Sequence, residues 1–347
     1  MPEPNVLIIT TGHDLEDGRL VRHCRSLLRA GITVNLEKIS TSSRFSRFFW
    51  GPLRAYRLIK SSSSNCVILP DPELQLFLPP FLHRNFAVIS DVHENYEQVL
   101  FDRVWISRSM VPPIKVLTKI LRKVRDRWSH VVVTVDNSLA LDDYLIVSNH
   151  PNPVDLPPPP ESPPEMRLIY VGDIRESRGL SAMLRLIQAI PSLSLDLVGP
   201  CENAESLYQK IDDLDLAERV NWHGRCSYDR SWELASHCLA GLSLLSSTPS
   251  FRDAVPTKIW EYWAVGLPIL AFDVPGQSKV IHAAKGGVVG SHDELVETLK
   301  AWIESPILAR DIGSQGRKYF LKTSSHSKEG LSGAIENAMS IFRMKAQ

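Results

Sequence analysis

The residues of this chain best suited to chemistry stand together between Asp253 and Glu261. Pro256 fits the first turn of a helix, where its missing N–H has no cost, and Thr257 and Lys258 would follow in that turn. Free amides and the positive end of such a helix form a phosphate site. Glu261 falls one turn further in, where its carboxylate can accept hydrogen bonds from two vicinal hydroxyls. Asp253 lies in the loop that leads in, so the segment predicts a site for phosphate beside a pair of hydroxyls.

The same segment resembles the large retaining class of GT-B glycosyltransferases often called GT4. Members of that class carry two acidic residues separated by seven others, followed by a Gly-x-Pro turn into an apolar strand. Pro256–Tyr262 (Pro-Thr-Lys-Ile-Trp-Glu-Tyr) and Gly266–Pro268 match this pattern. The resemblance implies that Glu261 binds the ribose of a nucleotide-sugar donor and that Asp253 contacts the donor sugar. At Asp253 the class usually has glutamate.

A second segment, Tyr170–Leu180, is similar to the strand, loop and helix that place a basic residue before a glycine in this class. The resemblance implies that Arg178 neutralises the diphosphate as it leaves. The class often has another basic residue just after the first glycine of the loop, where this chain has Asp173. Arg175 is therefore the candidate substitute for it.

Two loops of the first half and one of the second extend the resemblance over nearly the whole chain. Ser90–Tyr96 resembles the Asp-x-His-Glu element at a strand end, which implies that His93 lies at the cleft near the donor sugar. Gly12 and His13 match, more loosely, a loop that approaches the phosphates. We expect the donor base to be recognised by the backbone of Trp222, His223, Gly224, Arg225 and Cys226.

The chemistry of glycosyl transfer fits these residue types. A departing nucleoside diphosphate gains negative charge, so cations and helix-end amides directed at it lower the barrier. Arg178, Lys258 and the amides near Thr257 would supply them. In retaining transfer the acceptor attacks from the side on which the diphosphate leaves, and the departing phosphate is able to take the acceptor's proton. We therefore expect no cofactor besides the nucleoside-diphosphate sugar, which is a co-substrate, and no required metal.

These residues need a scaffold, and the sequence alternates strands with helices. Apolar or β-branched runs predict strands at 6–10, 32–36, 66–69, 87–90 and 131–135 in the first half. The second half predicts strands at 168–171, 195–198, 220–222, 240–244 and 268–272, with helices at 179–190, 204–213, 228–236 and 256–265. Such alternation predicts parallel sheets, whose ligands bind beyond the carboxyl ends of the strands. The expected fold is α/β of the GT-B type, with two Rossmann-like domains whose sheets face each other across a cleft.

A proline-rich stretch separates the two halves. Eight of the chain's 24 prolines lie between Pro151 and Pro164, which predicts an extended linker. We expect an acceptor-binding domain over residues 1–160 and a donor-binding domain over 161–325. The resemblance implies that a last helix within 326–347 packs back on the first domain.

Composition and motifs exclude several other classes. The 347 residues have a formal net charge of zero, with 44% hydrophobic and 22% charged residues, which is typical of a globular protein. The longest apolar runs are far shorter than the roughly 20 residues of a transmembrane helix, and no secretion signal is apparent. No glycine-rich dinucleotide fingerprint or P-loop is present. Five widely spaced cysteines favour a reducing compartment. We expect a cytoplasmic protein with no nucleic-acid partner.

Two basic segments of the first half make an anionic membrane surface a candidate partner. Arg44–Lys60 mixes arginines with aromatic residues, and Lys115–Arg127 lies in a basic amphipathic helix predicted over 111–128. The alternative is an ordinary docked helix with a solvated basic face. Membrane binding would place the protein at the inner face of a membrane, where it would build a lipid-linked glycan or polysaccharide.

The sequence is thus interpreted as a retaining glycosyltransferase that moves a sugar from a nucleoside-diphosphate sugar to a glycan or lipid-linked acceptor. Two alternatives remain. One is a GT-B sugar-nucleotide epimerase or phosphorylase. The other is a non-catalytic subunit that binds sugar nucleotides. Asp173 and Asp253 replace the residues that the class usually has at these positions, which is compatible with a loss of activity.

Overall fold

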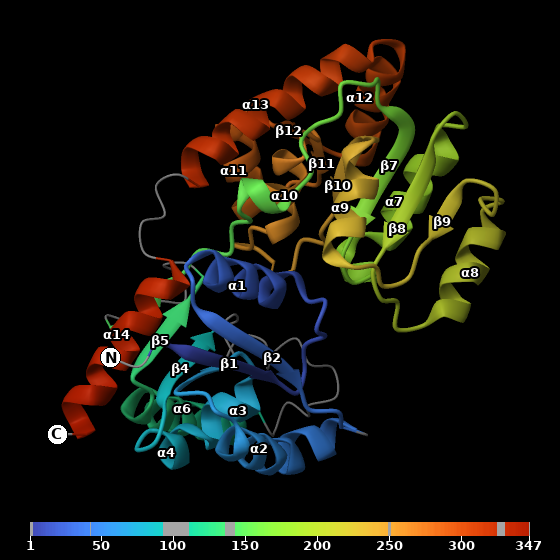
Figure 1. Cartoon of the computed structure of the whole chain (residues 1–347). Helices are drawn as coiled ribbons and strands as arrows, with labels where there is room; N and C mark the ends of the chain where they lie inside the picture. The colour runs from blue at the N-terminus through green and yellow to red at the C-terminus, as the bar shows by residue number, and fades with distance from the viewer. Residues whose placement is uncertain are drawn as a thin grey trace. The chain divides into compact units, whose positions relative to one another are not determined.

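The computed structural model describes residues 3–41, 43–92, 111–135, 143–248, 251–324 and 330–346. They form two compact units, Met1–Asn149 with Ser327–Gln347, and His150–His326. Within the described residues each unit is a parallel six-stranded sheet with helices on both faces (Figure 1). This confirms the predicted pair of α/β folds. The division between the units follows Asn149, whereas the sequence placed it near residue 160.

The sheet of the first unit has the strand order β2-β1-β3-β4-β5-β6. The chain passes from β1 to one side and then continues on the other, so its direction changes between β1 and β3. At such a switch point the carboxyl ends of the strands leave a crevice suited to a ligand. The strands are β1 (Asn5–Thr10), β2 (Thr33–Lys38), β3 (Cys66–Leu69), β4 (Ala87–Val92), β5 (Val131–Thr134) and β6 (Leu145–Ile146).

Alternate residues of β1 supply the two cores of this unit. Val6 and Ile8 join a cluster with α1 and α14, whereas Leu7 and Ile9 join a cluster with α2, α3 and α4 on the opposite face. The last helix, α14, therefore packs on the first sheet, beside β4 and β5 (red in Figure 1). The helices are α1 (Gly18–Arg29), α2 (Arg44–Ser61), α3 (Pro72–Phe77), α4 (Pro79–Leu82), α6 (Val111–Trp128) and α14 (Leu331–Ala346).

The sheet of the second unit has the order β12-β11-β10-β7-β8-β9, so its switch point lies between β7 and β10. The strands are β7 (Glu165–Val171), β8 (Ser194–Val198), β9 (Val220–Trp222), β10 (Cys238–Ser243), β11 (Ile269–Ala271) and β12 (Gly287–Val289). The helices are α7 (Leu180–Ala189), α8 (Ala204–Asp213), α9 (Tyr228–Ser236), α10 (Thr257–Ala264), α11 (Pro275–Ala284), α12 (His292–Glu304) and α13 (Pro306–Ser324). Among the helices described, none has a stretch long and apolar enough to cross a bilayer.

The proline-rich segment runs along the second unit. The His150 and Trp260 rings lie 4.0 Å apart, and Pro159 lies against Gly266, where a Cβ would come within 2.7 Å of its Cγ. Arg310 on α13 donates a hydrogen bond of 3.1 Å to the carbonyl of Glu161. These contacts hold the proline-rich segment to α10, to the turn after it and to α13.

Two glycines let α13 approach α10 closely. A Cβ at Gly313 would overlap the carbonyl oxygen of Gly266, and a Cβ at Gly316 would overlap the indole of Trp263. Trp263 is fully buried, and its Nε1 donates to the carbonyl of Gly286 at 2.8 Å. Because both partners are held in place, the contact has no room for a methyl group.

We expect Gly316→Ala to lower the free energy of unfolding by about 1–3 kcal/mol, because overpacking outweighs the better helix propensity of alanine. Gly333→Ala on α14 is the matched control, since a Cβ at Gly333 would have no neighbour within 4 Å. It should raise the free energy of unfolding by about 0.5–1 kcal/mol. Urea denaturation measures both, and equal effects of the two substitutions would contradict the packing argument.

Candidate functional site

Close backbone contacts shape the carboxyl edge of the second sheet, at the switch point between β7 and β10. Gly172, directly after β7, has a φ of +138°, and a Cβ at Gly199 after β8 would overlap its carbonyl. Gly179 has a φ of +92°, and a Cβ there would overlap the carbonyl of Leu244. Side chains are excluded at these positions, so the loop between β7 and α7 lies flat against its neighbours.

Arg178 is the residue that this loop presents. It ends a short 3₁₀ turn, Glu176–Arg178, and precedes the left-handed Gly179 at the start of α7. Its guanidinium carbon lies 4.8 Å from the centre of the Phe251 ring, a cation–π contact that orients the partly exposed side chain. Arg178 is thus a well-oriented cation at the switch point.

Lys258, in the first turn of α10, is buried rather than on the surface. Its Nζ lies 3.6 Å from the centre of the Tyr170 ring, and a Cβ at Gly172 would lie 3.0 Å from it. Burial lowers the pKa of Lys258 well below its usual value, and the charge of Arg178 lowers it further. The carboxylates of Glu261 and Asp173 oppose this shift only in part. An anion placed here would therefore meet two closely spaced basic groups.

Glu261 follows on the same helix and is also buried. The hydroxyl of Tyr228, the first residue of α9, donates a 2.9 Å hydrogen bond to its Oε1. The neighbouring Tyr262 accepts a hydrogen bond from the Val171 amide at 3.0 Å and donates one to the Ile169 carbonyl at 3.2 Å. These contacts hold α10, and with it Glu261 and Lys258, against the end of β7.

Other predicted residues of this unit are more exposed than Lys258 and Glu261. Asp253 is exposed, in a turn ahead of α10, and Thr257 is the first residue of α10 and is half-buried. Arg175 forms a 2.6 Å ion pair with Asp173, and both side chains are exposed to water. Asp173 stands where the class often has a basic residue, and it pairs with Arg175, the candidate to replace that basic residue.

The loop after β9 is tied to the loops after β7 and β8. Gly224 has a φ of +64°, and its carbonyl accepts a 2.7 Å hydrogen bond from the Gly199 amide. Trp222 Nε1 donates to the Gly199 carbonyl at 2.9 Å. Cys226 Sγ lies 3.9 Å from the carbonyl of His223. The backbone here follows the same edge of the sheet as Arg178.

In the first unit, the loop after β1 rests on buried carboxylates. Asp71 accepts hydrogen bonds from the Thr10 hydroxyl at 2.6 Å and the Thr11 amide at 2.7 Å. A Cβ at Gly12 would lie 2.7 Å from Asp71 Oδ1, so a larger residue there would have to displace this buried carboxylate. Burial alone would lower the pKa of His13, but its contact with Asp17 and the surrounding carboxylates raise it. The loop is therefore built around acidic groups.

His93 lies outside the described residues. Asp91, two residues before it, is fully buried at the end of β4 and receives a 3.0 Å hydrogen bond from Arg19 Nε. His23 Nε2 lies 3.0 Å from the same carboxylate. Sequence reasoning missed these partners on α1, as well as Tyr170 and Tyr228. Only Tyr262, within the matched motif, carried a sequence signal.

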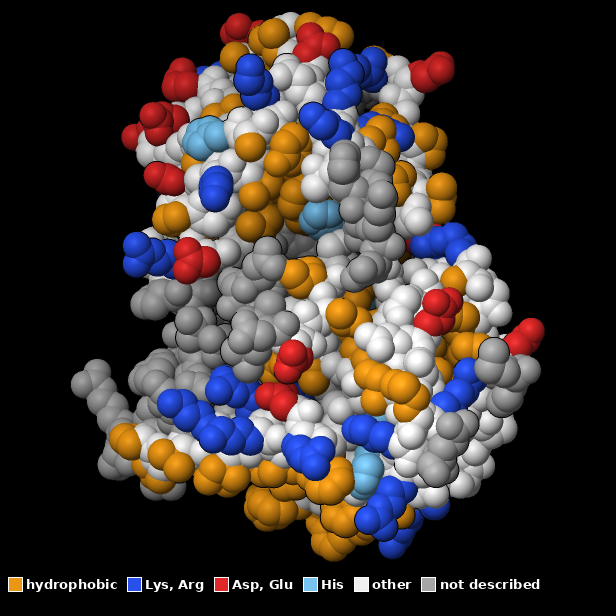
Figure 2. Space-filling view, turned by 90° about the vertical axis from the view of Figure 1, so that its left-hand side faces the viewer, with side chains coloured by type: hydrophobic (Ala, Val, Ile, Leu, Met, Phe, Trp, Pro, Cys, Tyr) orange, Lys and Arg blue, Asp and Glu red, His pale blue; other side chains and the backbone are white. Residues whose placement is uncertain are grey.

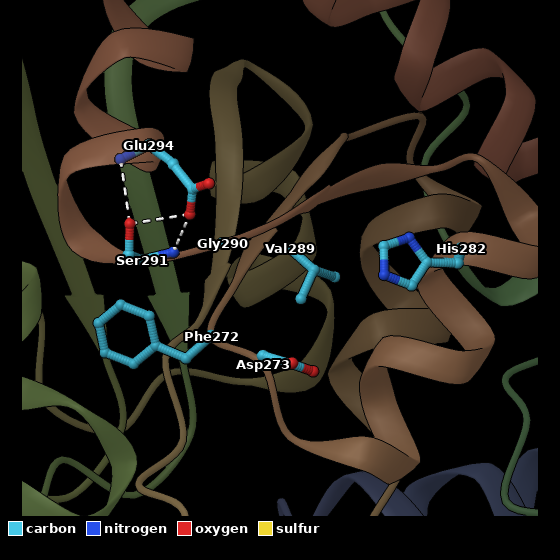
Figure 3. A pocket seen from close by; sticks show the side chains of 7 residues that line it. All are labelled: Phe272, Asp273, His282, Val289, Gly290, Ser291 and Glu294. Atoms are coloured by element: carbon cyan, nitrogen blue, oxygen red, sulfur yellow. Dashed lines mark hydrogen bonds between the residues drawn. The ribbon is translucent and has the colours of Figure 1, made fainter.

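An open hollow of about 500 Å³ lies elsewhere, at the carboxyl ends of β11 and β12 (Figure 3). Phe272, Asp273 and His282 line it, with the start of α12. The amide of Ser291 already donates to Glu294 at 2.7 Å, and Ser291 Oγ accepts from the Glu294 amide. Because the helix end is capped by its own carboxylate, the hollow is not a prepared anion site.

We expect Lys258→Met to raise the free energy of unfolding by about 1–2 kcal/mol at neutral pH, because it removes a buried charge next to Arg178. The folded-state pKa of Lys258 is below its unfolded value of 10.5. Between the two values the unfolded chain binds more protons, so wild-type stability rises with pH and the gain from the substitution shrinks. Urea denaturation at neutral pH and at about pH 9.5 measures this change; a gain independent of pH would contradict the origin assigned to it.

Comparison with known proteins gives the fold, and a family model matches part of the chain. Residues 157–319 match the family model described as glycosyl transferases group 1. An uncharacterized glycosyltransferase of Haemophilus influenzae is 27% identical over 158 residues, 43% of this chain and 43% of that protein. The match thus spans less than half of the curated relative.

Solved structures resemble the chain over nearly its full length. Sucrose-phosphate synthase from Thermosynechococcus elongatus has a TM-score of 0.68 at 14% identity, covering 99% of both chains. HepE of Anabaena, in complex with UDP and glucose, has a TM-score of 0.65 at 12% identity, covering 99% of this chain and 98% of that one. WaaG, a glycosyltransferase involved in lipopolysaccharide biosynthesis, has a TM-score of 0.62 at 13% identity, covering 97% and 99%. The chain has the GT-B fold, and residues 157–319 of its second unit match the model of glycosyl transferases group 1.

Proposed function

We propose that the protein transfers a glycosyl group from a nucleoside-diphosphate sugar to a glycan or lipid-linked acceptor, with retention of anomeric configuration. The observation that carries this proposal is the convergence of Arg178, Lys258 and the start of α10 beside buried Glu261, at the switch point of the second sheet. The family and fold support a glycosyl transfer enzyme. The residues below are assigned to it as part of the proposal.

The diphosphate of the donor would bind between Arg178 and the first turn of α10. Arg178 is oriented by Phe251, and the amides at Thr257 and Lys258 precede the first hydrogen-bonded turn of the helix. Lys258 shares this space, and a bound diphosphate would restore the charged form that burial disfavours. As the bond to the sugar breaks, charge grows on the diphosphate, and these groups stabilise it. Because Arg178, Lys258 and the helix amides supply the positive charge that the diphosphate needs, we propose that no metal is required.

Glu261 would accept the two ribose hydroxyls, held in place by Tyr228. The backbone around Gly224 and Cys226 would contact the base. Asp253 would contact the donor sugar. Arg175 is a weaker candidate for the diphosphate because Asp173 already neutralises it.

In the proposed reaction the acceptor hydroxyl attacks the anomeric carbon on the face from which the diphosphate leaves. The bond from the anomeric carbon to the phosphate oxygen breaks as the new glycosidic bond forms. The departing phosphate oxygen takes the proton of the acceptor hydroxyl, so the products are the glycoside and the nucleoside diphosphate. No side-chain nucleophile has to form a covalent intermediate.

Similar structures suggest where to begin. HepE was solved with UDP-glucose, and TarM with UDP. WaaG is described as acting in lipopolysaccharide biosynthesis. These proteins share only the fold with this chain, but they make UDP-sugars the first donors to test and surface glycans the first acceptors.

Turnover tests the proposal directly. We expect the purified chain to release the nucleoside diphosphate slowly from one of the UDP-, GDP- or dTDP-sugars, in EDTA as well as without it. Arg178→Ala should lower kcat by about 100-fold or more with a smaller change in the donor KM, because the charge it meets grows in the transition state. Arg185→Ala, an exposed arginine on α7, is the matched control.

Donor binding without any release would identify the chain as a non-catalytic subunit, and conversion of the donor without transfer would identify an epimerase. Once an acceptor is found, the coupling constant of the anomeric proton in the product gives its configuration. Inversion would rule out the proposed geometry.

We expect Glu261→Ala to weaken binding of the matching nucleoside diphosphate by roughly 1–3 kcal/mol, because charge-assisted hydrogen bonds to ribose are lost. Tyr228→Phe should cause a smaller loss by releasing the carboxylate. Titration calorimetry measures both, with the exposed Glu304→Ala as the control. If Glu261→Ala left the affinity for the nucleoside diphosphate unchanged, the ribose would not bind at Glu261.

A further inference from the structure

Helix α2 packs on the first sheet with one side only. Ala55 and Ile59 are fully buried in the core beneath it. On the outer side Phe45, Phe49 and Trp50 are 69%, 59% and 56% exposed to solvent. Aromatic side chains gathered on an exposed helix face are unusual in a protein that keeps this surface in water.

Helix α4 contacts α2, and α6 in turn contacts α4. Phe81 on α4 is 66% exposed, and its ring lies 6.4 Å from that of Tyr56 on α2. His83, just after α4, contacts Trp128 of α6 with ring centres 4.4 Å apart. We call the large exposed apolar residues of these three helices the aromatic face: Phe45, Phe48, Phe49, Trp50, Leu53, Phe81, Val116, Leu117 and Ile120.

Basic side chains border the aromatic face. The exposed ones are Arg54, Arg57 and Lys60 on α2, Arg84 after α4, and Lys119, Lys123 and Arg127 on α6. Within 43–61, 72–86 and 111–128 the acidic residues are Glu73, which is buried and paired with Arg47 at 2.7 Å, and Asp126, paired with Arg125 at 2.7 Å. Figure 2 shows hydrophobic side chains along the lower edge of the molecule with Lys and Arg side chains beside them. The net charge of this surface is therefore positive, which complements an anionic partner.

The position of the apolar residues along the helices is informative. Helices α2 and α6 follow β2 and β4 and lead back to parallel strands, so their first halves lie toward the carboxyl edge of the sheet. Most of the exposed apolar residues of α2 and of α6 lie in these halves. Arg47 of α2 extends over the loop after β1, where a Cβ at Gly12 would lie 2.7 Å from its Nη1. The aromatic face thus borders the edge at which the first unit would hold a ligand.

We propose that the aromatic face docks on an anionic lipid bilayer, with its rings at the headgroup boundary and the basic residues against lipid phosphates. Aromatic rings and cations on one helix face suit that boundary better than a soluble polyanion, which would not need exposed phenylalanines. This deepens the proposed function, on which it rests, because a lipid-anchored acceptor would be presented at the carboxyl edge of the first sheet.

Co-sedimentation with vesicles tests the proposal. The full chain should bind vesicles of phosphatidylcholine mixed with phosphatidylglycerol, bind phosphatidylcholine alone at least about tenfold more weakly, and lose binding in high salt. Phe49→Ser with Trp50→Ser, and separately Arg54→Gln with Arg57→Gln and Lys60→Gln, should each weaken binding at least about tenfold. Matched controls on the second unit, Ile307→Ser with Leu308→Ser, and Lys279→Gln with Lys300→Gln and Lys318→Gln, should bind like the wild type.

Brominated lipids add a readout that depends on insertion. They should quench part of the wild-type tryptophan fluorescence, and Trp50→Phe should remove much of that quenching. The proposal would be overturned if the wild-type chain did not bind anionic vesicles. It would also be overturned if the second-unit control variants lost as much binding as the variants of the aromatic face. Nucleotide affinity, measured without lipid, should be unchanged in all variants, so a failure of lipid binding is distinct from a failure of the proposed glycosyl transfer.

Discussion

A single buried hydroxyl holds the chemistry of the second unit in place. Tyr262 on α10 bonds to the backbone of β7 as both donor and acceptor, at Ile169 and Val171. Its ring lies so close to β10 that a Cβ at Gly241 would come within 2.6 Å of it. The start of α10 and its carboxylate are thereby fixed against the two central strands of the sheet. Tyr262 thus positions Lys258 and Glu261, and the close contacts of Gly172 and Gly179 position the loop that carries Arg178.

That position is unfavourable for the unliganded protein. Lys258 is buried near the charge of Arg178, and its Nζ lies over the face of the Tyr170 ring. Such an arrangement lowers stability, and it is explained if an anion completes the site. In the first unit the polarity is opposite, since Asp71 and Glu73 lie buried at the corresponding switch point. The two switch points therefore suit different kinds of ligand.

Elements that depend on local sequence could be predicted, whereas elements that depend on contacts between residues distant in sequence could not. Strands such as β1, β3 and β5 are short runs of buried apolar residues, and local patterning is sufficient to find them. The edge strands β6 and β12, with two and three residues, are set by neighbouring strands and leave almost no local pattern. Helix α2 was not recognised, because its aromatic residues lie on the solvent side and Pro52 interrupts its interior.

The same distinction applies to the site. Arg178, Lys258 and Glu261 could be named as candidates because each lies in a local motif. Tyr228 and Tyr170 are distant in sequence from the groups they contact, so only the tertiary fold reveals them. The pairing of Arg175 with Asp173 likewise depends on the course of the loop.

Helix α14 has a consequence for synthesis. Its residues Leu331, Ile335 and Ala338 complete the core of the first unit, yet they follow the entire second unit in the chain. Domains usually fold in the order in which the ribosome makes them. Here the first unit emerges with α1 but not α14 on this face of its sheet, so the cover over β4 and β5 must wait until the second unit is translated. Until then the core residues that α14 covers stay exposed to water, and a chain that stops before residue 331 never buries them.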